Sequence, residues 1–210
     1  MTEVKKSIEL KQLKIEDKPL FDRYWSFDKY PNSESNFTTM FTWSDGYHVR
    51  YALVDDFLVV IAKHAETGIY HHLPIGKGDI TPVMEYLRET YDVEGKKYCL
   101  CPLSSGMKEK IEREMPGKYE FQPIRDSFDY VYSVERLSTL KGKKMNAKRN
   151  HYKKFVSTYA YTYHRIGPKD IQRCKEAAIS FVNRENKNAA EEIKALERLF
   201  DNYQALGVVG

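Results

Sequence analysis

Strand-like runs rich in apolar residues recur in the first third of the chain, separated by short polar stretches. They cover residues 8–13, 47–54, 57–63 and 69–73. Short runs of this kind, bounded by turn residues, are typical of β-strands. Asp55 and Asp56 separate the second run from the third and predict a two-residue hairpin turn. The pattern therefore predicts a β-meander.

Helical periodicity begins after this meander. Thr81 and Pro82 predict the N-cap and the first position of a helix that ends at about residue 91. A further strand is predicted at residues 98–101, and a helix follows at residues 104–114. We therefore expect helices to pack against the sheet.

Aromatic residues mark the next strand-like stretches, at residues 119–123 and 127–134. A basic helix is predicted at residues 142–159, and residues 160–166 resemble one more strand. The elements together predict an α/β (α+β) fold in which helices flank a mixed sheet.

The C-terminal part is predicted to form two amphipathic helices, separated by residues 186–188. Residues 207–210 resemble the start of a strand. An apolar helix face must be buried against another layer, and no further sheet follows these helices. We therefore expect that the natural chain continues beyond Gly210, or that a partner supplies the missing layer.

The composition is that of a globular protein, with 41% hydrophobic and 30% charged residues among 210. The longest strongly apolar run, residues 57–62, is far shorter than the roughly 18 residues of a membrane span. Charged residues occupy the N-terminus where a secretory signal needs an apolar segment. We therefore expect no transmembrane segment and a cytoplasmic location.

Cysteine and histidine give no metal-site pattern. The three cysteines are too few and too scattered for a disulfide framework. Cys99 and Cys101 share one face of the predicted strand, but no second pair or nearby histidine completes a metal site. His71 and His72 are adjacent and point to opposite faces of a strand. We expect reduced cysteines and no metal.

The charge is distributed unevenly along the chain. Residues 136–169 contain ten Lys or Arg and no Asp or Glu, which leaves −6 for the rest of a chain whose total is +4. Concentrated positive charge repels itself in a compact fold unless an anion balances it. The partner would be phosphate, RNA or an acidic lipid headgroup. The alternative is an ordinary solvated helix face.

The register of the basic helix places cations beside apolar residues. Met145, Tyr152, Phe155 and Val156 fall on one side, and Arg149 falls on the same stripe. Lys148 lies next to Arg149. A cation at the edge of a buried face is costly unless it is paired. The candidate acidic partners are Asp126 and Asp129.

A functional interpretation of the same helix is an anion clamp. Arginine can hold a phosphate through two parallel hydrogen bonds, and lysine acts as a point charge. The anion- or RNA-binding candidates are Lys143, Lys144, Lys148, Arg149 and Asn150.

A second candidate is a phosphate loop between a strand and a helix. Gly76, Lys77 and Gly78 would let backbone amides approach a phosphate at a helix N-terminus. Two neighbouring glycines also occur in ordinary turns, so the alternative interpretation is a turn without phosphate binding. The chain contains no P-loop, nucleophile elbow, HExxH or dinucleotide motif.

Three strings resemble a bacterial family pattern, DYVY followed by LxxLxGKK and KRN. They are residues 129–132, 137–144 and 148–151. Residues 37–43, 74–79 and 205–207 agree with the family in order, so the resemblance covers essentially the whole chain. The chain thus resembles the phosphatidylglycerol lysyltransferase C-terminal-domain-like family, many members of which have no assigned function.

The resemblance implies two acyl-CoA N-acyltransferase-like folds in tandem. Residues 1–166 would form the first, and residues 167–210 would be the opening helices of a second, incomplete one. The missing part of the second domain would pack on residues 167–210. The donor would be acyl-CoA or aminoacyl-tRNA, without a separate cofactor, and the acceptor a lipid or another amine or hydroxyl.

Three functions follow as hypotheses. The first is an acyl- or aminoacyl-transferase that holds tRNA or another polyanion through the clamp, with Asp129, Tyr130 and Tyr132 as candidates for proton transfer. The second is a non-catalytic, degenerate transferase fold that binds RNA or an anionic surface such as lipid headgroups. The third is a structural half-protein whose basic helix packs on the missing domain. The sequence is compatible with both catalytic and non-catalytic functions.

Overall fold

The computed structural model describes residues 8–27, 32–64, 68–92, 97–185 and 189–210. Contacts divide the chain into two compact units. The first comprises Met1–Gln122 with Pro168–Val208, and the second comprises Pro123–Gly167 with Val209–Gly210. Contacts therefore group the two C-terminal helices with the N-terminal segment. The assignment of residues 167–210 to a second N-acyltransferase-like domain stays a prediction.

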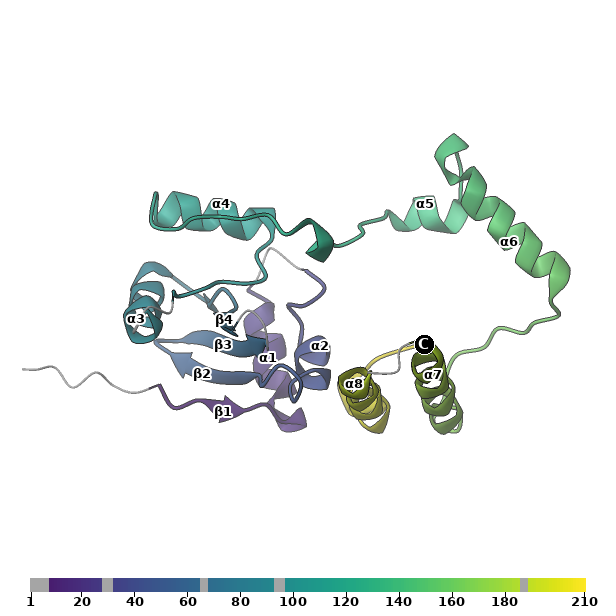
Figure 1. Cartoon of the computed structure of the whole chain (residues 1–210), viewed down its shortest axis with the longest axis horizontal. Helices are drawn as coiled ribbons and strands as arrows, with labels where there is room; N and C mark the ends of the chain where they lie inside the picture. Colours follow the sequence, from purple (N-terminus) through teal and green to yellow (C-terminus); the bar gives the residue numbers. More distant parts are fainter. Residues whose placement is uncertain (1–7, 28–31, 65–67, 93–96, 186–188) are drawn as a thin grey trace, which may run out of the picture. The chain divides into compact units, whose positions relative to one another are not determined.

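The first unit contains a five-stranded sheet, in which β5 pairs with β3. The other four strands have the order β1-β2-β3-β4 (Figure 1). All named pairs are antiparallel. The strands are β1 (Lys11–Gln12), β2 (Arg50–Val54), β3 (Phe57–His64), β4 (Gly68–His71) and β5 (Ile75–Gly76). The predicted meander is confirmed, with a shorter first strand.

The turn between β2 and β3 uses two residues in the left-handed region. Asp55 has a φ of 46° and Asp56 a φ of 61°, and the flanking Val54 and Phe57 are paired. Two consecutive positive φ values match the tight hairpin turn whose twist suits the strands, and aspartate tolerates this conformation. The predicted hairpin is confirmed.

Strand β3 is buried on both faces, because side chains along a strand point alternately to opposite sides. Leu58, Val60 and Ala62 pack with the residues of α1 (Lys18–Trp25) and α2 (Phe37–Thr42). The alternate residues pack with α3 (Thr81–Tyr91) and α4 (Ser105–Glu114), and these are Phe57, Val59 and Ile61. Helices therefore flank the sheet, which confirms the predicted α/β (α+β) class.

Capping residues define where the helices of this unit begin. Helix α3 begins at Thr81 with Ile80 in the N-cap position, so the prediction of Thr81 as the N-cap is wrong. The Asp79 carboxylate accepts the Thr81 N–H at 2.9 Å. Ser104 caps α4 by accepting the Met107 N–H, as the predicted helix requires. A short 3₁₀ helix, η1 (Ile15–Asp17), precedes α1.

The predicted strand at residues 98–101 is wrong. This segment makes one parallel bridge, between His71 and Leu100. The His71 N–H donates to the Cys99 carbonyl at 2.8 Å, and the Cys101 N–H donates to the His71 carbonyl at 2.9 Å. The segment therefore crosses the end of β4 at one residue and then leaves the sheet.

The two predicted C-terminal helices are confirmed as α7 (Ile171–Glu185) and α8 (Ala190–Asp201), and a short α9 (Tyr203–Leu206) follows. Residues 186–188 lie outside the described residues. Helix α8 packs on α2, and the buried Leu206 joins the core cluster of α1 and α2. Part of the apolar face of these helices is thus covered within the first unit. Residues 207–210 are not assigned to a strand, so the predicted strand there is wrong.

The second unit consists of helices and extended segments. Its elements are η2 (Arg125–Ser127), α5 (Val134–Thr139), η3 (Lys143–Met145) and α6 (Asn146–Thr158). Helix α6 confirms the predicted basic helix. The predicted strands at 119–123, 127–134 and 160–166 are wrong, because none of them has a paired strand among the described residues.

Among the described helices of both units, none has the length and apolar character needed to cross a membrane.

Candidate anion-binding site

The basic stretch begins at a turn that the backbone of two residues shapes. Ser133 caps α5, accepting the Arg136 N–H at 3.1 Å, and the helix ends at Leu140 with a φ of 49°. Gly142 follows with a φ of 92°, a conformation that strains any residue with a side chain. The chain then enters η3 and α6. The Leu-Lys-Gly sequence therefore sets the sharp change of direction between α5 and the basic helix.

Arg149 reaches back from α6 to this turn. Its Nη1 donates to the carbonyl of Leu140 and, at 2.9 Å, to the carbonyl of Gly142. Its Nη2 lies 3.4 Å from Asn146 Oδ1. The sequence suggested Asp126 or Asp129 as partners, whereas the structure gives Arg149 backbone carbonyls. The half-buried guanidinium thus donates hydrogen bonds to carbonyl groups at and just after the end of α5.

The remaining members of the predicted clamp lie on the surface. The side chains of Lys143, Lys144, Lys148 and Asn150 are all exposed. Lys144 belongs to the 3₁₀ helix η3, whereas Lys148 and Arg149 are consecutive residues of α6 and lie about 100° apart around its axis. The structure therefore directs Arg149 to the turn and leaves the side chains of the three lysines exposed.

The predicted apolar stripe of α6 is buried only at its beginning. Met145 is 5% exposed, whereas Tyr152 and Phe155 are 58% and 47% exposed. The Phe155 ring lies 5.3 Å from that of Tyr159 and 5.2 Å from that of Tyr161. A hydrogen bond with Tyr152 raises the pKa of the Tyr161 hydroxyl. The prediction that Tyr152 and Phe155 face the core is therefore wrong, because both side chains are exposed.

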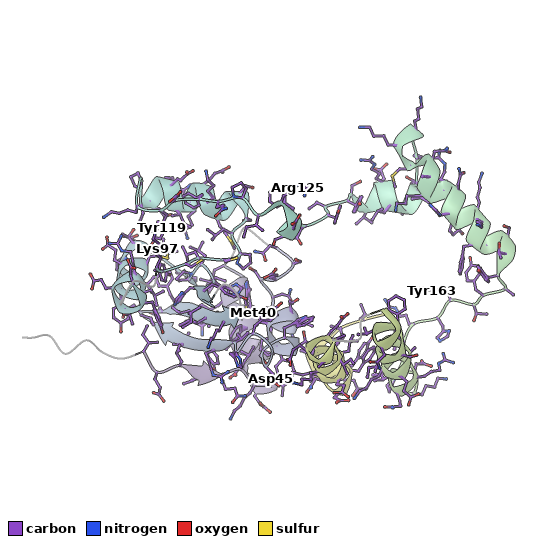
Figure 2. The ribbon with its side chains drawn as sticks, viewed as in Figure 1. Met40, Asp45, Lys97, Tyr119, Arg125 and Tyr163 are labelled. Carbon is purple, nitrogen blue, oxygen red and sulfur yellow. The ribbon has the colours of Figure 1, made fainter. Side chains whose placement is uncertain are left out.

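The proton-transfer candidates lie in the extended segment between η2 and α5. Asp129, Tyr130 and Tyr132 are all exposed, with Tyr130 at 83%. Arg125 lies over the Phe128 ring at 5.0 Å just before them (Figure 2). A catalytic group that must be shielded from water would need further covering here. Their catalytic role stays a prediction.

The candidate phosphate loop has a structural explanation for each residue. A Cβ at Gly76 would lie 2.6 Å from the Phe57 ring, so β5 can approach β3 only with glycine there. Lys77 Nζ lies 4.8 Å from the centroid of the Phe27 ring. Gly78 has a φ of 103°. The Asp79 carboxylate already occupies the first amide of α3, where a phosphate would bind. Phosphate binding by this loop stays a prediction, with less support than the lysines of α6.

A cavity of about 350 Å³ lies in the first unit, between the end of α2 and helix α8. Four of its charged groups form two ion pairs, since Arg198 Nη1 lies 2.8 Å from Asp45 and Lys194 Nζ lies 2.9 Å from Glu191. Figure 2 labels Asp45 beside α2. The sequence could not reveal this cavity, because the segments that line it are far apart in the chain and carry no motif.

A metal centre has no evident ligand set in the described part of the chain. No group of three or more His, Cys, Asp or Glu residues is placed to hold an ion. Cys99 is exposed and Cys101 is half-buried.

Comparison with known proteins assigns the family. The sequence profile of the family named "Phosphatidylglycerol lysyltransferase, C-terminal" matches residues 27–210. The chain belongs to this family. The family had been suggested by the DYVY, LxxLxGKK and KRN strings, and this prediction is confirmed.

One solved structure is also similar, that of a conserved protein of unknown function from Bacteroides thetaiotaomicron. It has a TM-score of 0.86 and 30% sequence identity, and the similarity covers 97% of this chain and 70% of that chain. No curated protein matches significantly. Membership of the phosphatidylglycerol lysyltransferase C-terminal family thus gives a lysyltransferase-like domain without fixing its reaction.

Proposed function

We propose that this member of the phosphatidylglycerol lysyltransferase C-terminal family takes part in acyl or aminoacyl transfer. Aminoacyl-tRNA is the preferred donor, acyl-CoA is the alternative, and the acceptor is a lipid or another amine or hydroxyl. The family match supports the transferase class. The charge of the second unit supports a polyanionic donor.

The observation that carries the proposal is a set of exposed lysines in η3 and α6, within a segment that has no acidic residue. Lys143 and Lys144 lie in η3 and Lys148 lies in α6, and the side chains of all three are exposed. No Asp or Glu occurs between residues 136 and 169. Exposed cations without acidic neighbours in the sequence attract a phosphate backbone through release of its counterions. The exposed Tyr152 and Phe155 add rings on which a base can stack.

In this proposal the protein accelerates transfer mainly by positioning donor and acceptor. Attack of an amine or hydroxyl on an activated ester needs orientation and stabilisation of the developing oxyanion. Asp129, Tyr130 and Tyr132 are the proposed proton-transfer groups. Residues 1–166 and 167–210 are proposed to belong to two N-acyltransferase-like folds, and further chain packing on residues 167–210 would cover the exposed Phe181.

A second candidate function is a non-catalytic module that binds RNA or anionic lipid headgroups. One observation favours it: the three proton-transfer candidates lie exposed in an extended segment. Such a module uses the same lysines, so binding alone does not separate the two functions.

The first test is the binding of unfractionated tRNA at a series of salt concentrations. A phosphate-binding site predicts that log K falls linearly with log salt concentration, and each lost contact lowers the slope by about 0.7–0.9. We expect K148A to lower affinity and slope. K118A removes an exposed lysine outside the basic stretch and is the matched control. A wild-type slope near zero would contradict both binding functions.

The second test separates enzyme from binding module. The protein is incubated with tRNA charged with a radiolabelled amino acid and with phosphatidylglycerol vesicles or small amines. The transferase predicts labelled product that K148A diminishes at subsaturating tRNA. Tight, salt-dependent tRNA binding without any labelled product would favour the non-catalytic module.

A further inference from the structure

Arg149 is the one member of the predicted clamp that is half-buried, and it contacts protein rather than pointing freely into solvent. Each terminal nitrogen of the guanidinium carries two N–H protons that it can donate. The two acceptors of Nη1, the carbonyls of Leu140 and Gly142, match that number. This nitrogen therefore has no further proton to offer a phosphate while the contacts persist.

The two carbonyls flank the residue at which the chain changes direction. Leu140 is the left-handed end of α5 and Gly142 has a positive φ, so Lys141 lies between two unusual backbone conformations. A planar guanidinium bridging both carbonyls restricts how they rotate relative to each other. The contact therefore fixes the turn to the first turns of α6.

The lysines depend on this turn for their placement. Lys141 lies within it, and Lys143 and Lys144 form the 3₁₀ turn that follows. Met145 is buried immediately afterwards and anchors the start of α6. If the turn were free, the direction of residues 141–144 relative to Lys148 would vary, and the lysines would not be held together for a ligand.

We propose that Arg149 is a positioning residue of the anion-binding site, which orders the turn at residues 140–142 so that Lys143 and Lys144 are held beside Lys148. The inference rests on the proposed function, because it assumes that these lysines bind a polyanion. It assigns Arg149 a role different from that of a direct phosphate ligand.

The test combines a measurement on the free protein with one on tRNA binding, in R149A, R149K and K148A. Hydrogen exchange of the backbone amides at residues 141–146 reports the order of the turn without a ligand. We expect exchange about tenfold faster in R149A, because lost hydrogen bonds to a charged group are worth at least that factor. K148A should exchange like the wild type.

Binding of unfractionated tRNA then distinguishes charge from geometry. The positioning role predicts that R149A and R149K both lose about five- to tenfold in affinity, because lysine keeps the charge and lacks the planar fork. A direct phosphate ligand predicts weaker binding and a lower salt slope in R149A but unchanged amide exchange at residues 141–146 in the free protein. G142A disturbs the same turn, so its effect and that of R149A should be strongly non-additive in the double variant.

Each result decides between the two roles. Unchanged exchange in R149A, or faster exchange with unchanged tRNA affinity, would overturn the positioning role and leave the proposed function standing. Normal binding by R149K would also overturn it. A wild-type protein that does not bind tRNA would instead overturn the proposed function, and the positioning role with it.

Discussion

The guanidinium of Arg198 lies 2.8 Å from the carboxylate of Asp45. The same guanidinium lies 4.2 Å from the centroid of the Phe41 ring. Helix α8 is thereby attached to the end of α2 by an ion pair and by a cation–π contact, which involve segments at opposite ends of the sequence. This attachment adds to the packing of α8 on α2 within the first unit.

Replacing Arg198 by alanine is expected to weaken this attachment. Asp45 is largely exposed, so the ion pair is worth at most about 1 kcal/mol, and the cation–π contact adds about 0.5–1 kcal/mol. We expect R198A to lower the free energy of unfolding by about 1–2 kcal/mol. D45N removes only the ion pair and should cost less. Urea denaturation measures both, and an equal loss in the two variants would contradict the role of Phe41.

The close contact at Gly76 gives a second prediction. A Cβ there would lie 2.7 Å from the Asp56 carbonyl oxygen as well as against Phe57, and neither can move without disturbing the hairpin. G76A should therefore lower the free energy of unfolding by about 2–3 kcal/mol. G78A meets no neighbouring atom and carries only backbone strain of about 1–2 kcal/mol. Thermal unfolding of both variants tests this order, and a smaller loss in G76A would refute it.

The sequence was most informative where local chemistry and burial agree. Asp55 and Asp56 fit the tight turn, and Phe57 and the residues after it are apolar on both faces, as a strand covered by helices requires. Such elements could be predicted because each depends on residues close together in the chain.

Predictions were wrong where structure depends on a partner distant in the sequence. The alternating residues Phe128, Tyr130 and Tyr132 have the pattern of a strand, but a strand exists only when another strand completes its hydrogen bonds. The site shows the same limit. The basic helix itself was predicted, whereas the contact of Arg149 with the Gly142 carbonyl depends on backbone conformation that a charge pattern does not encode.

The hydrogen bond between Tyr51 and Asp17 gives a spectroscopic prediction. The Tyr51 hydroxyl donates to Asp17 Oδ1 at 2.8 Å, and burial together with this carboxylate raises the pKa of Tyr51 to about 12. The folded state therefore favours neutral Tyr51, and this contribution to stability is present below pH 10 and is lost as the pH rises towards 12.

Absorbance titration of tyrosinate, with Y51F subtracted, measures this pKa. We expect D17N to lower it only in part, because burial is the larger cause and remains. A return of the Tyr51 pKa to about 10 in D17N would show that the carboxylate, and not burial, dominates.

The buried His71 gives a prediction in the acid range. Its side chain is 1% exposed, its ring lies 4.5 Å from Tyr91 and 4.7 Å from Tyr98, and neither ring nitrogen has a hydrogen-bond partner among the residues described. Burial lowers the pKa of His71 to about 4, and the nearby Cys99 carbonyl opposes this shift only in part. That carbonyl accepts the backbone N–H of His71.

The groups next to His71 do not offset this effect. The neighbouring His72 is also buried, and burial, with the charge of His71, lowers its pKa to about 4. The thiols of Cys99 and Cys101 offer no negative charge that would compensate, since burial raises the pKa of each.

The unfolded chain therefore takes up protons at these histidines before the folded chain does. Stability is fully present above pH 6.5 and is lost as the pH falls from 6.5 to about 4, by up to about 3 kcal/mol for His71 alone. H71F keeps an aromatic ring between Tyr91 and Tyr98 and removes the titrating group. We expect it to be less sensitive to acid than the wild type in urea denaturation between pH 7 and 4, while H151F, at an exposed position of α6, serves as the surface control. A pH profile of H71F that parallels the wild type would show that His71 is not the source of the acid sensitivity.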